Sequence, residues 1–205
     1  MFELLVTTGL GYAIGSVPSA AWLARLKGKA IFDIGSGSMG AMNTARNVGW
    51  TLGILVLVAD TGKGVFATSL ARRMASLTET DGLAALAFAL TAGVGAVAGH
   101  AWSMFAGFKG GKALATTFGV ALPVYPLAAL YALIVLVGLI LLSRRVVLAS
   151  VITALCYPFV VLATLWRQGH PQDTMFSVFT SVMIISSIVL IKHIPDLRRG
   201  EERLF

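Results

Sequence analysis

Long apolar blocks dominate this chain of 205 residues and restrict the folds open to it more than any other feature. Hydrophobic residues make up 57% of the sequence and charged residues only 12%, about half the charged share of a soluble domain. A helix needs about 20 apolar residues to cross a bilayer, whereas a transmembrane barrel shows alternating segments of about ten residues. The blocks are continuous, so the sequence predicts an all-α, polytopic integral membrane protein.

Six blocks are long enough to span a membrane, and a seventh is shorter. The six are Leu4–Leu26, Trp50–Leu70, Leu83–Phe105, Val124–Leu142, Val146–Trp166 and Thr174–Ile191. The seventh is Leu114–Val124. Pro123 near its end and Pro126 just after it predict a break before the next helix. A short or broken span is tolerated where it is buried in protein. We expect seven transmembrane helices, one of them short, in a single domain that covers residues 1–205.

Basic residues predict the orientation, because Lys and Arg gather on the cytoplasmic side of membrane proteins. With seven spans and the N-terminus outside, twelve basic residues lie on the cytoplasmic face, and only Arg72, Arg73 and Arg167 lie outside. Six spans would place the basic C-terminal tail opposite the first loop. The charges therefore favour a multi-pass protein of the cell membrane with its C-terminus in the cytoplasm.

The net charge of +7 is explained by basic residues that mark the cytoplasmic face of a membrane protein. No nucleic-acid partner is therefore expected. Cys156 is the only cysteine, which excludes an intrachain disulfide and a cysteine metal cluster. No histidines have metal-ligand spacing either. We expect neither a metal nor a cofactor.

Two glycine-rich, basic loops, at residues 35–46 and 108–117, interrupt the apolar blocks. Glycine lets backbone N–H groups approach an anion, while Lys and Arg supply charge. The candidate phosphate-binding residues here are Ser36, Ser38, Asn43, Arg46, Lys109, Gly110, Gly111, Lys112 and Thr116. The second loop is not a Walker A motif, because Ala106 and Ala113 occupy positions at which that motif is specific. Simpler interpretations are an ordinary polar loop, and lysines that anchor a helix end at the headgroups.

Ionisable groups inside the spans are further candidates, because charges in a membrane are costly and usually functional. Asp60 and Lys63 lie one turn apart, which predicts a structural ion pair, with a proton relay as the weaker alternative. His100 and His193 are candidate catalytic groups, since His can act as a general base near neutral pH. Neither histidine is followed by Asp five residues on, so the His–Asp motif of well-known acyltransferases is absent.

Several short motifs follow one another along the chain. They are Gly35-Ser36-Gly37-Ser38 followed by Gly40-Ala41, Asn43 and Arg46, then Asp60, Lys63 and Gly64, then Gly99-His100, then Phe108-Lys109-Gly110-Gly111-Lys112, and finally His193, Asp196 and Gly200-Glu201-Glu202. With this order and spacing, nearly the whole chain resembles the acyl-phosphate-dependent glycerol-3-phosphate acyltransferase family of bacterial membranes, the PlsY type.

The resemblance implies an enzyme of phospholipid biosynthesis. It would transfer a fatty acyl group from acyl phosphate to the 1-hydroxyl of glycerol 3-phosphate, giving lysophosphatidic acid and phosphate. The partners implied are these two substrates and the lipid bilayer, and we expect a monomer. The catalytic residues would be His100, Arg46, Lys112 and His193. The two loops would hold phosphate, with Asp196 and Glu202 contributed by the tail.

Five positions depart from the family pattern. They are Ser38, Met42, Ala113, Val147 and Asp196, where the family has Asn, Thr, Gly, Ser and Asn. Because several of these changes remove phosphate donors, two alternatives stay open. One is a divergent, non-catalytic paralogue that binds lipid phosphate. The other is an organic-phosphate transporter, although a transporter usually carries ligand groups near the midplane.

Overall fold

The computed structural model describes residues 2–77 and 82–199, and every regular element in these ranges is a helix. The α-helices are α1 (Phe2–Gly15), α2 (Ser19–Arg25), α3 (Ala41–Asn47), α4 (Trp50–Leu77), α5 (Gly82–Ala101), α6 (Leu114–Val124), α7 (Pro126–Ser143), α8 (Val146–Arg167) and α9 (Gln172–Arg199). Two short 3₁₀ helices, η1 (Ile31–Asp33) and η2 (Met104–Ala106), lie in loops. The predicted all-α fold is confirmed.

Six helical segments in the described ranges are long and apolar enough to cross a membrane, and α6 is a shorter apolar helix. The six are Phe2–Arg25, Trp50–Leu77, Ala85–Ala106, Pro126–Ser143, Val146–Arg167 and Gln172–Arg198. The short helix begins and ends at the residues predicted from the sequence. Tyr125 separates it from α7, which starts at Pro126, so the predicted break is also confirmed.

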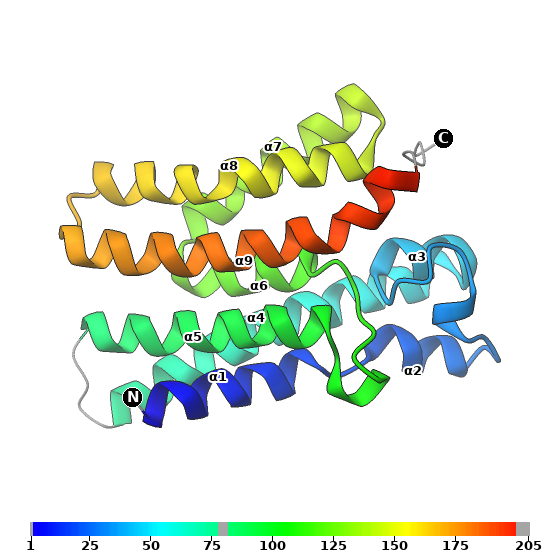
Figure 1. Cartoon of the computed structure of the whole chain (residues 1–205), viewed down its shortest axis with the longest axis horizontal. Coiled ribbons are helices and arrows are strands. Elements are labelled where there is room, and N and C mark those ends of the chain that lie inside the picture. The colour runs from blue at the N-terminus through cyan, green and yellow to red at the C-terminus, as the bar shows by residue number, and fades with distance from the viewer. Residues whose placement is uncertain (1, 78–81, 200–205) are drawn as a thin grey trace.

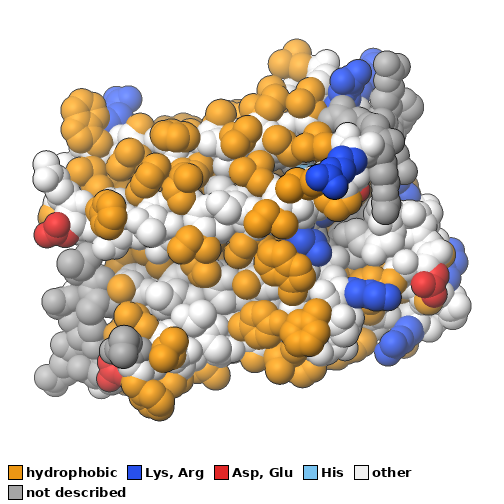
Figure 2. All heavy atoms as spheres, in the orientation of Figure 1, with side chains coloured by type: hydrophobic (Ala, Val, Ile, Leu, Met, Phe, Trp, Pro, Cys, Tyr) orange, Lys and Arg blue, Asp and Glu red, His pale blue; other side chains and the backbone are white. Residues whose placement is uncertain are grey.

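The long helices run side by side, and the short elements gather at one end of the bundle (Figure 1). The helices α7, α8 and α9 lie on one side and α1, α4 and α5 on the other, with α6 between them (Figure 1). The end that carries α2 and α3, here named the loop end, also holds the connection from α5 to α6 and the end of α9. Figure 2 shows apolar side chains along the length of the bundle, with Lys and Arg mostly at the loop end.

Glycines bring α1 and α5 into backbone contact. A Cβ added at Gly11 would lie 2.1 Å from the carbonyl oxygen of Ala92, and one at Gly15 would lie 2.0 Å from that of Ala96. In return, a Cβ at Gly99 would lie 2.1 Å from the carbonyl oxygen of Tyr12. Small residues four apart allow such close packing in membranes, where dispersion contacts rather than hydrophobic burial hold helices together. This interface sets the position of the end of α5, where His100 lies.

The sequence predicted the first span as one apolar block, Leu4–Leu26. In the structure this span is divided into two helices, α1 and α2. Pro18 lacks a backbone N–H, and the residues around it leave backbone groups without helical partners. The carbonyl oxygen of Ser16 accepts a hydrogen bond from Ser103 Oγ, and Tyr12 Oη donates to the carbonyl oxygen of Trp102 at 2.6 Å. The break therefore ties the first span to the turn that follows α5.

A small core packs the first glycine-rich loop against the bundle. Its buried members come from α2, η1, the loop and α4, and they are Ala20, Ala21, Ala24, Ile31, Met39 and Val56. Ile31 and Met39 are each only 1% exposed, so the segment before α3 is anchored at both ends. The loop is thus a packed part of the fold and presents defined groups to its surroundings.

Candidate active site

A cavity of about 710 Å³ opens between the two glycine-rich loops and extends into the bundle. Helices α3, α4, α6, α7, α8 and α9 all contribute to its wall. At the loop end the wall carries charged and polar side chains, and deeper along α7 and α8 it is largely apolar. A ligand that carries both a charged group and a hydrocarbon chain matches such a division.

Most of the predicted site residues meet at the polar end of this cavity. The residues on its wall are Ser36, Ser38, Asn43, Arg46, His100, Lys112, His193 and Asp196. Of the other candidates, Lys109, Gly110, Gly111 and Thr116 are not on its wall. Glu202 lies outside the described residues. The structure thus brings both loops and the end of α9 to one place, as the motifs predicted.

The side chain of Asn43 holds the first loop in shape. Its Nδ2 donates hydrogen bonds to the carbonyl oxygens of Ile31, Ile34 and Ser38, at 3.3, 3.2 and 2.8 Å. Its Oδ1 accepts one from the backbone N–H of Ser36 at 3.1 Å. These contacts use both ends of the amide, so Asn43 orders the loop that presents Ser36 and Ser38.

The second loop places its residues differently from the prediction. Lys109 is exposed and lies over the ring of Phe32, with Nζ 5.7 Å from the ring centroid. Gly111 packs on His100, and a Cβ added there would lie 2.1 Å from Nε2 of that imidazole. The backbone N–H of Gly111 donates to the carbonyl oxygen of His100 at 3.1 Å. The glycines therefore serve the close approach of the loop to His100, which carries Lys112 to the cavity.

The two threonines of this segment also differ. Thr116 is fully buried and is not on the cavity wall, whereas Thr117 lies on it. The Oγ1 atoms of both threonines are buried without a hydrogen-bond partner among the described residues, so only their placement relative to the cavity distinguishes them. Sequence reasoning named Thr116 from its motif position, and the helical phase of α6 puts its neighbour on the site.

The N-terminus of α6 points into the polar end. Lys112, Ala113 and Leu114 lie on the cavity wall where this helix begins. The first backbone N–H groups of a helix lack internal partners and carry partial positive charge, which favours an anion. Ala113 reaches this position with φ 61°, a left-handed conformation that is costly for residues other than glycine.

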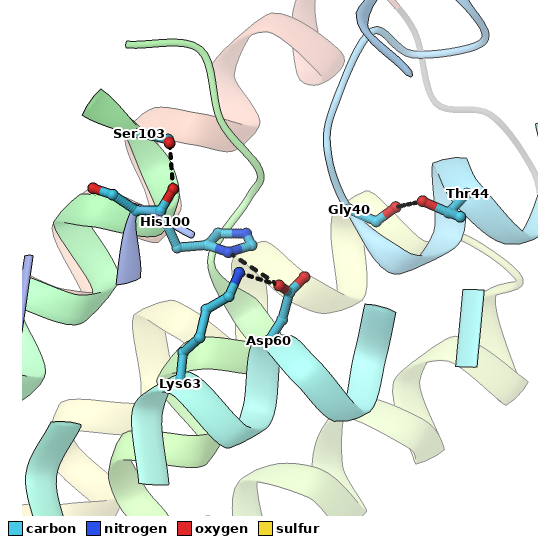
Figure 3. A network of polar contacts seen from close by, with 7 residues as sticks. Gly40, Thr44, Asp60, Lys63, His100 and Ser103 are labelled. Carbon is cyan, nitrogen blue, oxygen red and sulfur yellow. Dashed lines mark hydrogen bonds and ion pairs between the residues drawn. The ribbon is translucent and has the colours of Figure 1, made fainter. Parts of the chain in front are cut away.

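Three ionisable side chains form a buried group beside the cavity (Figure 3). Lys63 Nζ lies 2.6 Å from Asp60 Oδ1, which confirms the predicted ion pair. The same oxygen lies 3.7 Å from Nδ1 of His100, which comes from α5 (Figure 3). Each of the three is less than a tenth exposed. A carboxylate thus faces the histidine after all, supplied by another helix instead of by a neighbouring sequence position.

At the end of α9, His193 and Asp196 face the cavity one turn apart. His193 is 1% exposed, and its Nδ1 contacts the carbonyl oxygen of Val189 at 2.7 Å. A carbonyl only accepts, so Nδ1 carries the proton in this contact and Nε2 can accept one. Asp196 forms an ion pair with Lys112 of the second loop.

The apolar part of the cavity lies between α4, α6, α7 and α8. Its wall includes Leu57, Phe118, Ala129, Leu133, Leu136 and Tyr157. Along α8 the wall runs from Val146 to Tyr157, which at 1.5 Å per residue is about 16 Å. Among the described residues, no group of three or more His, Cys, Asp or Glu is placed to hold a metal ion.

Known proteins of similar sequence identify the family of this chain. The family model described as glycerol-3-phosphate acyltransferase matches residues 5–202. The chain belongs to the glycerol-3-phosphate acyltransferase family. A curated glycerol-3-phosphate acyltransferase of Geobacter sulfurreducens is 35% identical over 202 residues, which cover 98% of this chain and 96% of that protein.

Solved structures show the family fold. The crystal structure of PlsY (YgiH), an integral membrane glycerol 3-phosphate acyltransferase, in its glycerol 3-phosphate form has a TM-score of 0.80 and 30% identity, and the match covers 98% of this chain and 94% of that one. The lysophosphatidic acid form matches with a TM-score of 0.79 over the same shares. This glycerol-3-phosphate acyltransferase family member is therefore a multi-pass membrane protein.

Proposed function

We propose that this chain transfers a fatty acyl group from acyl phosphate to the 1-hydroxyl of glycerol 3-phosphate at the polar end of the cavity. The observation that carries the proposal is that one cavity has a basic, glycine-rich polar end and an apolar part. The family supports an acyltransferase, and its solved members carry glycerol 3-phosphate and lysophosphatidic acid. The apolar part of the cavity can hold the hydrocarbon chain of the donor and of the product.

Two sets of donors support the binding of two phosphate groups. Ser36, Ser38 and Arg46 come from the first loop and α3, while Lys112 and the N-terminus of α6 come from the second loop. Arg can bind phosphate oxygens through two parallel hydrogen bonds, and Lys acts as a point charge. Lys109 is exposed and is not on the cavity wall, so its proposed role is to attract anions toward the cavity entrance by its charge.

The reaction needs alignment and charge stabilisation more than a protein nucleophile. An acyl phosphate is already activated, so the acceptor hydroxyl oxygen forms a bond to the acyl carbon and the bond from that carbon to the phosphate oxygen breaks. The electron pair leaves with phosphate, where Lys112, Arg46 and the α6 N–H groups stabilise it. No metal or cofactor takes part in this scheme.

The proton of the hydroxyl goes to a phosphate oxygen or to His193. Nε2 of His193 can accept a proton, because Nδ1 already donates to Val189. His100 instead has Asp60 beside Nδ1 and Gly111 beside Nε2, so its ring supports the second loop. We assign His193 the proton transfer and His100 the positioning of Lys112.

The topology proposed is that of one domain, 1–205, with seven spans, α6 being the short one. The active site faces the cytoplasm and the N-terminus lies outside. The support is the positive-inside rule. Among the described residues, the basic side chains gather at the loop end, apart from the buried Lys63 and from Arg72, Arg73 and Arg167 at the opposite end. The apolar cavity is built within one chain, which supports an active monomer.

An assay with purified protein, palmitoyl phosphate and radiolabelled glycerol 3-phosphate tests the activity. We expect lysophosphatidic acid and phosphate in equal amounts, and a loss of activity in Arg46→Ala and Lys112→Ala. Arg167→Ala, at the opposite end of the bundle, is the matched control and keeps full activity. If no product forms at any donor concentration while the protein binds palmitoyl phosphate, the chain is a non-catalytic paralogue and the proposal is wrong.

A further inference from the structure

The ion pair between Lys112 and Asp196 occupies the place where the proposed reaction needs a positive charge. Both side chains lie on the cavity wall, and they are 29% and 18% exposed. Lys112 reaches the pair from the second loop and Asp196 from α9. In this structure, therefore, a carboxylate already neutralises the ammonium group that is proposed to hold phosphate.

The carboxylate is the more firmly placed partner. One turn before it, Lys192 donates a hydrogen bond to the carbonyl oxygen of Ala101 at 2.9 Å and lies 5.5 Å from the centroid of the Trp102 ring. The neighbouring His193 is buried in the same wall. Lys112 has a flexible stem and lies in the second loop, just before α6. When an anion binds, the ammonium can turn toward it, while Asp196 stays near.

We propose that Asp196 competes with substrate and product phosphate for Lys112, and so sets the affinity of the site for phosphate groups. This inference rests on the proposed function. A phosphate that approaches Lys112 must share or displace a fixed negative charge, and like charges at close range raise the free energy of the bound state. The same carboxylate takes Lys112 back when inorganic phosphate leaves, which limits product inhibition.

Asp196→Asn tests the competition, because the amide keeps the size of the side chain and removes its charge. We expect KM for at least one of the two substrates, and the inhibition constant of inorganic phosphate, to fall by at least about threefold. Asp33→Asn is the control, since Asp33 is an exposed carboxylate of η1 at the same end and lies off the cavity wall. Its constants should stay at wild-type values.

Unchanged or raised constants in Asp196→Asn would overturn the inference, because the carboxylate would then be neutral to binding or would help to orient Lys112. A fall of equal size in Asp33→Asn would also overturn it, since the effect would then be one of general surface charge. Asp196→Ser serves as a second variant should the amide impair folding, with the same expected direction.

A binding measurement separates this inference from the proposed function. Inorganic phosphate is titrated calorimetrically into wild-type protein, Asp196→Asn and the double variant Lys112→Met/Asp196→Asn in nanodiscs. Tighter binding in the single variant that is lost in the double variant supports competition at Lys112, even if the wild-type protein forms no lysophosphatidic acid. Equal binding by wild-type protein and Asp196→Asn overturns it, whatever the outcome of the activity assay.

Discussion

Oδ1 of Asp60 on α4 lies 3.7 Å from Nδ1 of His100 on α5, so a buried carboxylate faces a buried imidazole across two helices. The other ring nitrogen, Nε2, abuts Gly111 of the second loop. The imidazole is thus enclosed between a charge and a loop backbone. This position supports the proposed role of His100 in holding the loop, with proton transfer assigned to His193.

His100→Gln should lower kcat/KM by about tenfold, because the loop loses a packed support but the reacting groups remain. Loss of a general base typically costs about 10² to 10⁴ in rate, and His193→Gln is expected in that range. Steady-state kinetics with both substrates measure the difference. A loss in His100→Gln as large as that in His193→Gln would contradict the positioning role.

Loss of one partner of the Asp60–Lys63 ion pair should destabilise the protein far more than loss of both partners. Asp60→Leu leaves a buried ammonium without its partner and is expected to cost about 3–5 kcal/mol of stability. The double variant Asp60→Leu/Lys63→Met removes both charges and should recover most of that stability. Thermal unfolding in detergent measures the shift. Activity of the double variant should stay below wild type, because His100 has lost the carboxylate beside it.

A double variant as active as the wild-type protein would show that the pair only supports folding. A single variant as stable as the wild-type protein would show that Lys63 finds another partner or loses its charge. The two readouts, unfolding and kinetics, therefore separate the structural role of the pair from its role beside His100.

The sequence predicts the helical membrane fold, the short helix after the second loop and the convergence of both loops, because these follow from apolar block length, proline positions and charge. It does not predict the break at Pro18, which depends on hydrogen bonds between residues far apart, such as Ser103 and Ser16. Nor does it predict the contact of Asp60 with His100, because the two residues lie on different helices. The spacing of Gly11 and Gly15 was a usable signal for close helix packing.

Gly111→Ala tests whether the second loop depends on its contact with His100. The added methyl would lie 2.1 Å from the imidazole Nε2, so ring or loop must shift and Lys112 with it. We expect kcat/KM to fall by at least about tenfold, since small misplacements of positioning groups are costly. Gly62→Ala, on α4, is the control, because a Cβ added at Gly62 would have no neighbouring atom within 4 Å. Equal activity of both variants would show that the contact does not position the site.

Asn43→Ala should loosen the first loop without unfolding the bundle. The variant loses hydrogen bonds to Ile31, Ile34, Ser38 and the backbone N–H of Ser36, each worth about 1 kcal/mol. We expect faster amide hydrogen exchange in residues 34–40, with exchange in α5 unchanged, and a higher KM for glycerol 3-phosphate. Unchanged exchange in the loop would show that the small core around Met39 holds it without the amide.

Ala113→Gly should stabilise the protein, because the residue before α6 is held at φ 61°. The left-handed conformation costs an L-residue roughly 1–2 kcal/mol, and glycine adopts it without that penalty. The lost methyl group and the greater freedom of glycine in the unfolded chain offset part of the gain, so we expect a net increase of about 0.5–1 kcal/mol in the free energy of unfolding. Ala115→Gly, in the first turn of α6, should instead cost up to about 1 kcal/mol. Chemical or thermal unfolding of the two variants in parallel measures the contrast, and a loss of stability in Ala113→Gly would mean that the buried methyl contributes more than the strained backbone costs.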